Sequence, residues 1–253
     1  MKLLDAIILG IIEGITEFLP VSSTGHLILA STLLKLSDSE FLKSFEIAIQ
    51  LGAILSVVVL YARTLLKDWK LVQKTILAFI PTCVVGLLAY KTIKRYLLGN
   101  ESVVIWALFI GGIVLICFEL YQRKRGQGIT DISYVQAFSI GLFQCISMIP
   151  GVSRSAATII GGMMLGIERR TIVEFSFLLA IPTMGAATAL DIYKSGAGFS
   201  TGEIEILLTG FIVSFVVALI SIKFLLRYIQ NHTFIPFGIY RIIVAGVFWL
   251  LMV

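Results

Sequence analysis

Long apolar runs separated by short polar segments dominate the chain. They cover residues 47–62, 75–90, 102–118, 175–190 and 206–222, and one more covers 233–253 with Arg241 inside it. With its flanking residues, each run reaches about the 20 residues that an α-helix needs to cross a bilayer. Because hydrocarbon leaves backbone polar groups without outside partners, such runs predict helices. The pattern therefore predicts an all-α integral membrane protein with six transmembrane helices.

Two further apolar segments, 3–34 and 133–166, are interrupted by proline and hydroxyl residues. Pro20 breaks the first segment, and Pro150 breaks the second. Ser22, Ser23 and Thr24 follow Pro20 as candidate N-caps of a second short helix, and the second segment also has a hydroxyl-rich helix start after its proline. We expect each segment to form a re-entrant helix–break–helix that enters and leaves the membrane on the same side.

The two halves of the chain resemble each other at an offset of 131 residues. This offset superposes Gly10 on Gly141 and Ser22 on Ser153, and the order of segments repeats as well. Three crossings in each half would turn the second half upside down, which gives an inverted-topology repeat. We therefore expect a single membrane domain, 1–253, built from repeats 1–125 and 126–253. Its site should lie where 20–26 meets 150–158.

Composition and charge agree with this architecture. Hydrophobic residues make up 58% of the chain and charged residues only 14%, which excludes an ordinary soluble domain. The net charge of +5 does not indicate a nucleic-acid partner, because the basic residues lie in short loops between spans. Loops 63–74, 121–131, 168–170 and 223–232 carry the larger share of lysine and arginine, which predicts that they face the cytoplasm. Both termini and the mouth of the first broken segment would then face outward.

The first broken segment carries acidic residues at membrane depth, where ionisable groups are costly and usually functional. Glu13 and Glu17 are spaced i and i+4 and so point from one helix face. Such a pair can hold a divalent cation such as Mg²⁺ or Ca²⁺, or one carboxylate can act as a base toward a serine or water. His26 can transfer a proton or attack phosphorus directly.

The second broken segment carries the residues that an oxyanion needs. Arg154 follows a Pro-Gly break at a predicted helix start, between Ser153 and Ser155. Helix N–H groups, short hydroxyls and a guanidinium together match the geometry and charge of a phosphate. This segment has Gln144 and Met148 where the first has its glutamates, so the site should be single and asymmetric.

Arg241 lies alone in the last span, with no motif around it. An isolated intramembrane cation usually has an acidic partner. We therefore expect Arg241 to pair with Glu46, Glu119 or Glu174 and to lie outside the site.

Two stretches, EGITEFLPVSSTGH at 13–26 and PGVSRSAAT at 150–158, resemble the signature regions of the bacterial undecaprenyl-diphosphate phosphatase family, also called bacitracin-resistance proteins. Chain length, spans and motif order agree over the whole chain. The resemblance implies an enzyme of the bacterial inner membrane. It would remove the terminal phosphate of a C55 isoprenoid diphosphate and give the monophosphate lipid carrier of cell-wall synthesis.

The resemblance also implies roles for individual residues. Glu13 and Glu17 would form the acidic pair and hold any metal, Ser23 would be the favoured nucleophile, and His26 would assist it or compete for that role. Arg154 would clamp the diphosphate. Ser153 and Thr158 would make supporting polar contacts. The residues that line the same loops would be Ser22, Thr24, Gly151 and Ser155. The residues do not decide whether Ser23, His26 or water is the nucleophile. They also leave open whether a metal is required and whether the protein forms a homodimer.

A secondary transporter or flippase for an anionic substrate or lipid is the alternative, since inverted repeats with broken helices are typical of alternating access. Confinement of the acids to the first repeat favours chemistry on one side of the membrane. It does not exclude transport of the lipid product.

Overall fold

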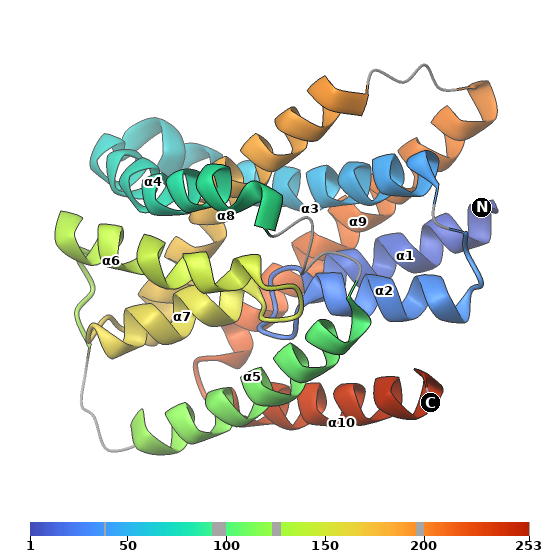
Figure 1. Ribbon diagram of the computed structural model, residues 1–253. Helices are drawn as coiled ribbons and strands as arrows, with labels where there is room; N and C mark the ends of the chain where they lie inside the picture. The colour runs from blue at the N-terminus through green and yellow to red at the C-terminus, as the bar shows by residue number, and fades with distance from the viewer. Residues whose placement is uncertain (38, 93–99, 123–127, 196–199, 253) are drawn as a thin grey trace.

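The computed structural model describes residues 1–37, 39–92, 100–122, 128–195 and 200–252. This part of the chain folds into ten α-helices and a short 3-10 helix, and it contains no β-strand (Figure 1). The first half holds α1 (Leu3–Thr16), α2 (Ser23–Leu33), α3 (Glu40–Lys67), α4 (Trp69–Thr92) and α5 (Glu101–Gln122). The second half holds α6 (Tyr134–Cys145), η2 (Ile146–Met148), α7 (Arg154–Met164), α8 (Arg169–Ser195), α9 (Thr201–Tyr228) and α10 (Ile235–Met252). The expected boundary between repeats, 125/126, lies outside the described residues.

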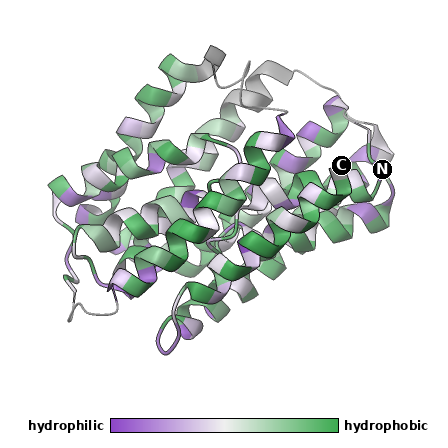
Figure 2. Cartoon of the chain, turned by 60° about the horizontal axis from the view of Figure 1, so that its bottom comes forward, coloured by the Kyte–Doolittle hydropathy of each residue, from purple (hydrophilic) through white to green (hydrophobic). Residues whose placement is uncertain are grey.

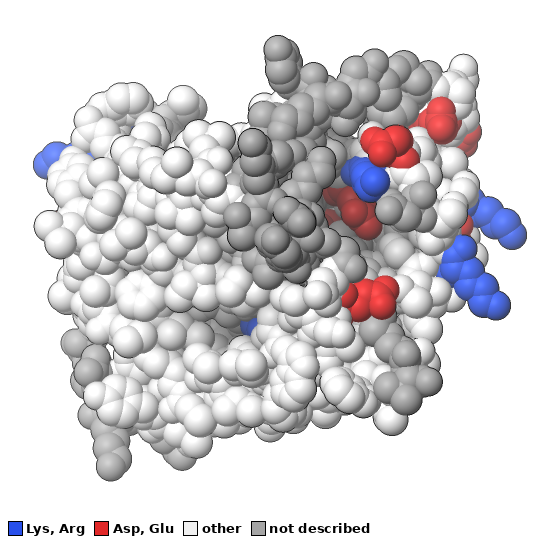
Figure 3. Space-filling view, viewed as in Figure 1, with Lys and Arg blue, Asp and Glu red and all other residues white. Residues whose placement is uncertain are grey.

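The prediction of an all-α, multi-pass membrane protein is confirmed. Within the described ranges, five helices are long and apolar enough to cross a bilayer, namely α3, α4, α5, α8 and α9, and the apolar stretch of α10 is shorter. Hydrophobic residues run along most of the helices, and hydrophilic ones lie mainly at helix ends and connections (Figure 2). The left part of the face in Figure 3 is almost free of charge, and most charged side chains visible there lie toward the right-hand end.

The two broken segments form helix hairpins, α1–α2 and α6–α7. They extend from opposite sides of the molecule, and their turns meet near its centre (Figure 1). At the end of each turn, the N-cap residue has a positive φ: 74° at Ser22 and 76° at Ser153. A non-glycine residue in this region costs roughly 1–3 kcal/mol, so both turns need support from their surroundings.

Small residues let the remaining helices hold the hairpins closely. Helix α9 packs against both α1 and α3, and α10 packs against α5. A Cβ atom on Gly10 would lie 2.9 Å from the carbonyl oxygen of Gly210, so only glycine permits this crossing of α1 and α9. Close backbone approach through small residues is the usual way for helices to associate in membranes.

The predicted ion pair of Arg241 is wrong. Arg241 is fully buried, and its guanidinium donates hydrogen bonds to five backbone carbonyls. Two of its expected partners pair elsewhere: Glu119 with Arg169, and Glu174 with Arg170. The five N–H groups of an arginine can be satisfied by carbonyl dipoles where a broken helix leaves carbonyls free.

Candidate active site

A cavity of about 310 Å³ lies between the two hairpin turns and helices α3, α4 and α8. Charged and hydroxyl residues from both turns line it, although the surrounding helices are apolar. The expected site residues on its wall are Glu17, Ser22, Ser23, Thr24, Gly151, Ser153 and Arg154. The two clusters predicted from separate halves of the sequence therefore form one cavity.

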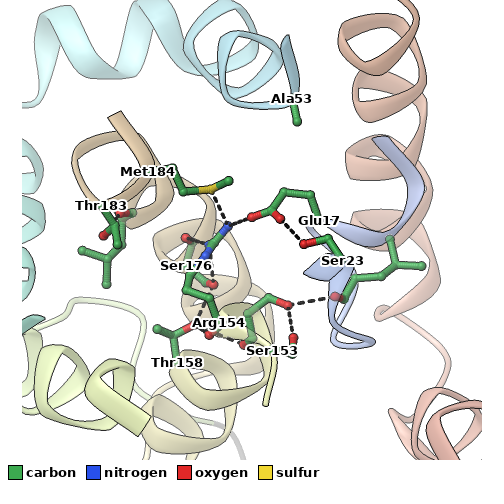
Figure 4. Close-up of polar contacts among 12 residues, drawn as sticks. Glu17, Ser23, Ala53, Ser153, Arg154, Thr158, Ser176, Thr183 and Met184 are labelled. Atoms are coloured by element: carbon green, nitrogen blue, oxygen red, sulfur yellow. Dashed lines mark hydrogen bonds and ion pairs between the residues drawn. The ribbon is translucent and has the colours of Figure 1, made fainter. Parts of the chain in front are cut away.

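Glu17 links the two hairpins through its two carboxylate oxygens (Figure 4). Oε1 accepts a hydrogen bond from Nη2 of Arg154 at 3.0 Å. Oε2 accepts one from Oγ of Ser23 at 2.5 Å. Glu17 follows the last residue of α1, and Ser23 is the first residue of α2, so the turn at Pro20 brings carboxylate and hydroxyl together. This contact gives the serine a proton acceptor.

The guanidinium of Arg154 is held on a second side by α8. Its Nη1 donates to the carbonyl oxygen of Ser176 at 2.6 Å, and the Ser176 hydroxyl lies 3.4 Å away. Thr158 supports this arrangement, since its hydroxyl lies 2.7 Å from that of Ser176. The Nε atom of Arg154 is buried and has no hydrogen-bond partner among the described residues. The guanidinium of Arg154 therefore keeps one N–H group without a partner among those residues.

Ser176 is a residue that the sequence did not point to. It lies in a long apolar run, where a serine reads as a small packing residue, and its side chain is fully buried. The functional signal is its place opposite Arg154, which only the fold reveals.

Glu13 lies one turn before Glu17 and is fully buried. Neither of its carboxyl oxygens has a hydrogen-bond partner in the described part of the chain. Glu17, Glu46 and Arg154 are all close enough to act on its charge. Glu13 is not on the cavity wall, so Glu17 is the only one of the two predicted acids that lines the cavity.

Ser155 and Ser153 fix the second turn against the first. The Ser155 hydroxyl donates to the carbonyl oxygen of Leu19 at 2.9 Å and lies 3.0 Å from the Ser153 hydroxyl. Ser153 also caps α7 by accepting from the backbone N–H of Ala156. Of the predicted N-cap candidates, Ser22 occupies the N-cap position of α2, but its side chain makes no capping bond.

His26 lies beside the cavity rather than on its wall. Its Nδ1 is 2.7 Å from the carbonyl oxygen of Ser22, and its Nε2 is 2.7 Å from the hydroxyl of Tyr240. A carbonyl oxygen only accepts, so Nδ1 carries a proton, and in a neutral ring Nε2 accepts from Tyr240. Both ring nitrogens are therefore engaged in holding the turn.

Thr82 and Thr183 give the cavity a neutral polar wall, and Gln144 binds both of them. Gln144 is fully buried, and its amide donates to the hydroxyls of Thr82 and Thr183 at 2.7 and 3.1 Å. The sequence contained a signal for both threonines, because each follows a proline inside an apolar helix, in Ile-Pro-Thr at 80–82 and 181–183. The same proline-then-hydroxyl pattern marked the two turns. Other cavity residues that the prediction missed are Gln50, Ser147, Met148, Met184 and Ala187, whereas Pro150 lies in the predicted stretch 150–158.

The arrangement suits the binding and transfer of an oxyanion. A guanidinium and the start of a helix attract negative charge, and a serine paired with a carboxylate is an activated nucleophile. In the described ranges, no group of three or more His, Cys, Asp or Glu side chains is placed to hold a metal ion. Any ion here would need ligands from a substrate as well.

Fold and site together define a multi-pass membrane protein with a polar cavity between two helix hairpins, whose wall carries an arginine, a glutamate and serines. The chain belongs to the family of the bacitracin resistance protein BacA, whose model matches residues 6–247.

Named relatives are similar over nearly the whole chain. An undecaprenyl-diphosphatase of Sulfurihydrogenibium sp. (strain YO3AOP1) is 50% identical over 253 residues, 99% of each chain. Those of Aquifex aeolicus (strain VF5) and Persephonella marina (strain DSM 14350 / EX-H1) are each 51% identical, over 96% and 99% of each chain. The family resemblance stated from the two motifs is therefore confirmed.

The pairing of Glu17 with Arg154 predicts a coupled effect on stability. Arg154→Met leaves a buried carboxylate without its cation and should lower the free energy of unfolding by about 3–5 kcal/mol. The double variant Glu17→Met/Arg154→Met removes both charges and should be less destabilised than either single variant. Unfolding by SDS titration in detergent micelles measures both.

Arg170→Met serves as the matched control, because its pair with Glu174 is more exposed and should be worth less than about 1 kcal/mol. Strictly additive effects of Glu17→Met and Arg154→Met would show that the two charges do not interact.

Proposed function

We propose that this chain is an undecaprenyl-diphosphatase: it hydrolyses undecaprenyl diphosphate to the monophosphate lipid carrier and inorganic phosphate. The observation that carries the proposal is the contact of Glu17 with both Ser23 and Arg154 inside an apolar protein. The name shared by relatives about half identical over the full chain supports the same activity.

Substrate binding would reorganise the Glu17–Arg154 contact. The terminal phosphate is the stronger partner for a guanidinium, and Arg154, which lines the cavity, has an N–H group at Nε that is not yet paired with any residue the structure describes. The carbonyl oxygen of Ser176 would keep its hydrogen bond to the guanidinium while the hydrogen bond between Arg154 and Glu17 breaks. The carboxylate then remains hydrogen-bonded to Ser23 and becomes a stronger base, because its cation now faces the phosphate.

Ser23 is the nucleophile that the geometry favours. Its Oγ would form a bond to the terminal phosphorus while its proton passes to Glu17, and the bond from phosphorus to the bridging oxygen would break. The lipid monophosphate leaves with the electron pair of that bond. Water then attacks the phosphorus of the phosphoserine, and Glu17 returns the serine proton to Oγ as the bond between Oγ and phosphorus breaks. The proton that the water loses passes to the freed Glu17 carboxylate and on to solvent, and inorganic phosphate leaves. Water attack without a covalent step would use the same carboxylate as base. His26 is less suited, since both its nitrogens are already engaged.

A divalent cation such as Mg²⁺ or Ca²⁺ is part of the proposal. Glu13 presents two buried carboxyl oxygens without partners next to Glu17, and oxygen is the ligand that both ions prefer. Glu13 and Glu17 would hold the ion together with substrate phosphate oxygens, as Mg²⁺ is commonly held by one or two carboxylates plus phosphate. The bound ion would offset the charge of the two phosphates.

The membrane arrangement follows from the hairpins. We propose six crossings and two re-entrant hairpins in an inverted repeat, with the site open to the outer face of the bacterial inner membrane. The same order of elements in both halves supports this topology, as do hairpins that enter from opposite sides. The basic loops on the other side support the orientation.

Phosphate release from a long-chain isoprenyl diphosphate in detergent tests the function. Wild-type protein should release phosphate, and Glu17→Gln should lower kcat by at least about 100-fold, because it removes the base. Ser23→Ala should remove both turnover and any phosphoserine intermediate trapped by rapid quench. Ser139→Ala, at a half-buried serine of α6 that does not line the cavity, is the matched serine control and should have wild-type activity.

No release by a folded wild-type protein would instead favour the transporter or flippase. Near-normal turnover of Ser23→Ala would leave the phosphatase standing and assign the attack to water or His26.

The cation has its own test. Chelation by EDTA should abolish phosphate release, and added Mg²⁺ or Ca²⁺ should restore it. Glu13→Gln should raise the metal concentration needed for half activity and weaken Mn²⁺ binding measured by electron paramagnetic resonance. Glu205→Gln, an exposed acid on α9, should change neither. Full activity in EDTA, with no bound Mn²⁺, would remove the metal from the mechanism.

A further inference from the structure

Arg241 of α10 forms hydrogen bonds to both hairpin turns. It donates to the carbonyl oxygens of Gly151 and Val152 in the second turn, each at 2.9 Å. It also donates to the carbonyl oxygen of Pro20 in the first turn, at 3.3 Å. Its remaining bonds go to Ala107 and Leu108 of α5, at 3.0 and 3.4 Å. One side chain of α10 thus joins both turns to α5.

The surroundings of Arg241 are shaped to receive its guanidinium. Helix α5 has a glycine at 111, where a Cβ atom would lie 2.8 Å from the guanidinium carbon and closer still to Nη2. One residue on, Gly112 faces the backbone of α10, where its Cβ would lie 2.7 Å from the carbonyl oxygen of Gly238. The space that α5 leaves is therefore filled by the guanidinium and cannot also hold a methyl group.

We propose that Arg241 is a positioning residue of the active site: it sets the register of the first turn, which carries Glu17 and Ser23, against the second turn, which carries Arg154. Each turn has a strained N-cap residue, Ser22 or Ser153, that needs external support. The three turn carbonyls that Arg241 binds, those of Pro20, Gly151 and Val152, lie within two residues of these positions. Arg241 does not line the cavity, so it acts on the reaction only through the turns.

Charge alone cannot supply this function. The partners are carbonyls of three separate segments, and only a guanidinium has enough N–H groups in a fixed plane to bind them all. A lysine keeps the charge but has a single nitrogen. Arg241→Lys protein should therefore lose the positioning of the turns although it keeps the positive charge.

The test uses two substitutions that disturb the same contact from opposite sides. Arg241→Lys removes the fork, and Gly111→Ala keeps the arginine but places a methyl group where the guanidinium lies. Each should lower kcat for isoprenyl diphosphate about 100-fold, the effect of a shift of about 1 Å between reacting groups, and change KM less than about 3-fold. In the double variant the second change should add less than a 2-fold loss, because both act on one guanidinium. Gly246→Ala, in α10 with open space around its Cβ, should behave as wild type.

The outcomes separate this inference from the proposed function on which it rests. Folded Arg241→Lys or Gly111→Ala protein with wild-type kcat overturns it. It is also overturned if neither variant folds, since Arg241 would then hold the whole fold rather than the turns. A wild-type protein without phosphate release, or an active Arg154→Met, would instead contradict the proposed function or its site.

Discussion

The structure depends on satisfying the backbone of two helices that are broken inside an apolar protein. A broken helix leaves N–H and C=O groups without partners, and lipid cannot supply them. Here the partners are side chains of other elements. Arg241 binds carbonyls of both turns, His26 binds the carbonyl of Ser22, and Ser155 binds that of Leu19. These bonds allow irregular backbone to exist at the centre of the molecule.

Buried turns create a place for chemistry that a continuous helix could not. A helix that starts at the centre of the molecule places the positive end of its dipole at the cavity, and its first residue, Arg154, adds a cation to the cavity wall. The other turn brings a carboxylate and a hydroxyl to the same cavity. The halves are similar in their turns but differ in charge, since Gln144 stands where the first half has Glu13. One half therefore supplies the acids and the other the anion site.

The sequence predicted the elements of the fold and the two clusters of the site, because both depend on local patterns. Apolar run length indicated the long helices, and proline followed by hydroxyls indicated the turns. The prediction was wrong at Arg241, since pattern reasoning assumes that a buried cation has an acidic partner. Carbonyls freed by a distant turn leave no mark in the local sequence. Ser176 was missed because its place opposite Arg154 depends on the fold and not on the local sequence. Thr82 and Thr183 were missed although each directly follows a proline inside an apolar helix.

The central claim is that acids and serine of one hairpin act on a phosphate held by the arginine of the other. The most direct measurement is an experimental structure with a non-hydrolysable isoprenyl methylene-diphosphonate bound in the cavity. The account predicts the terminal phosphonate within hydrogen-bonding distance of both the Arg154 guanidinium and the Ser23 hydroxyl, with its apolar tail among the helices. A terminal phosphonate bound away from both groups would contradict it.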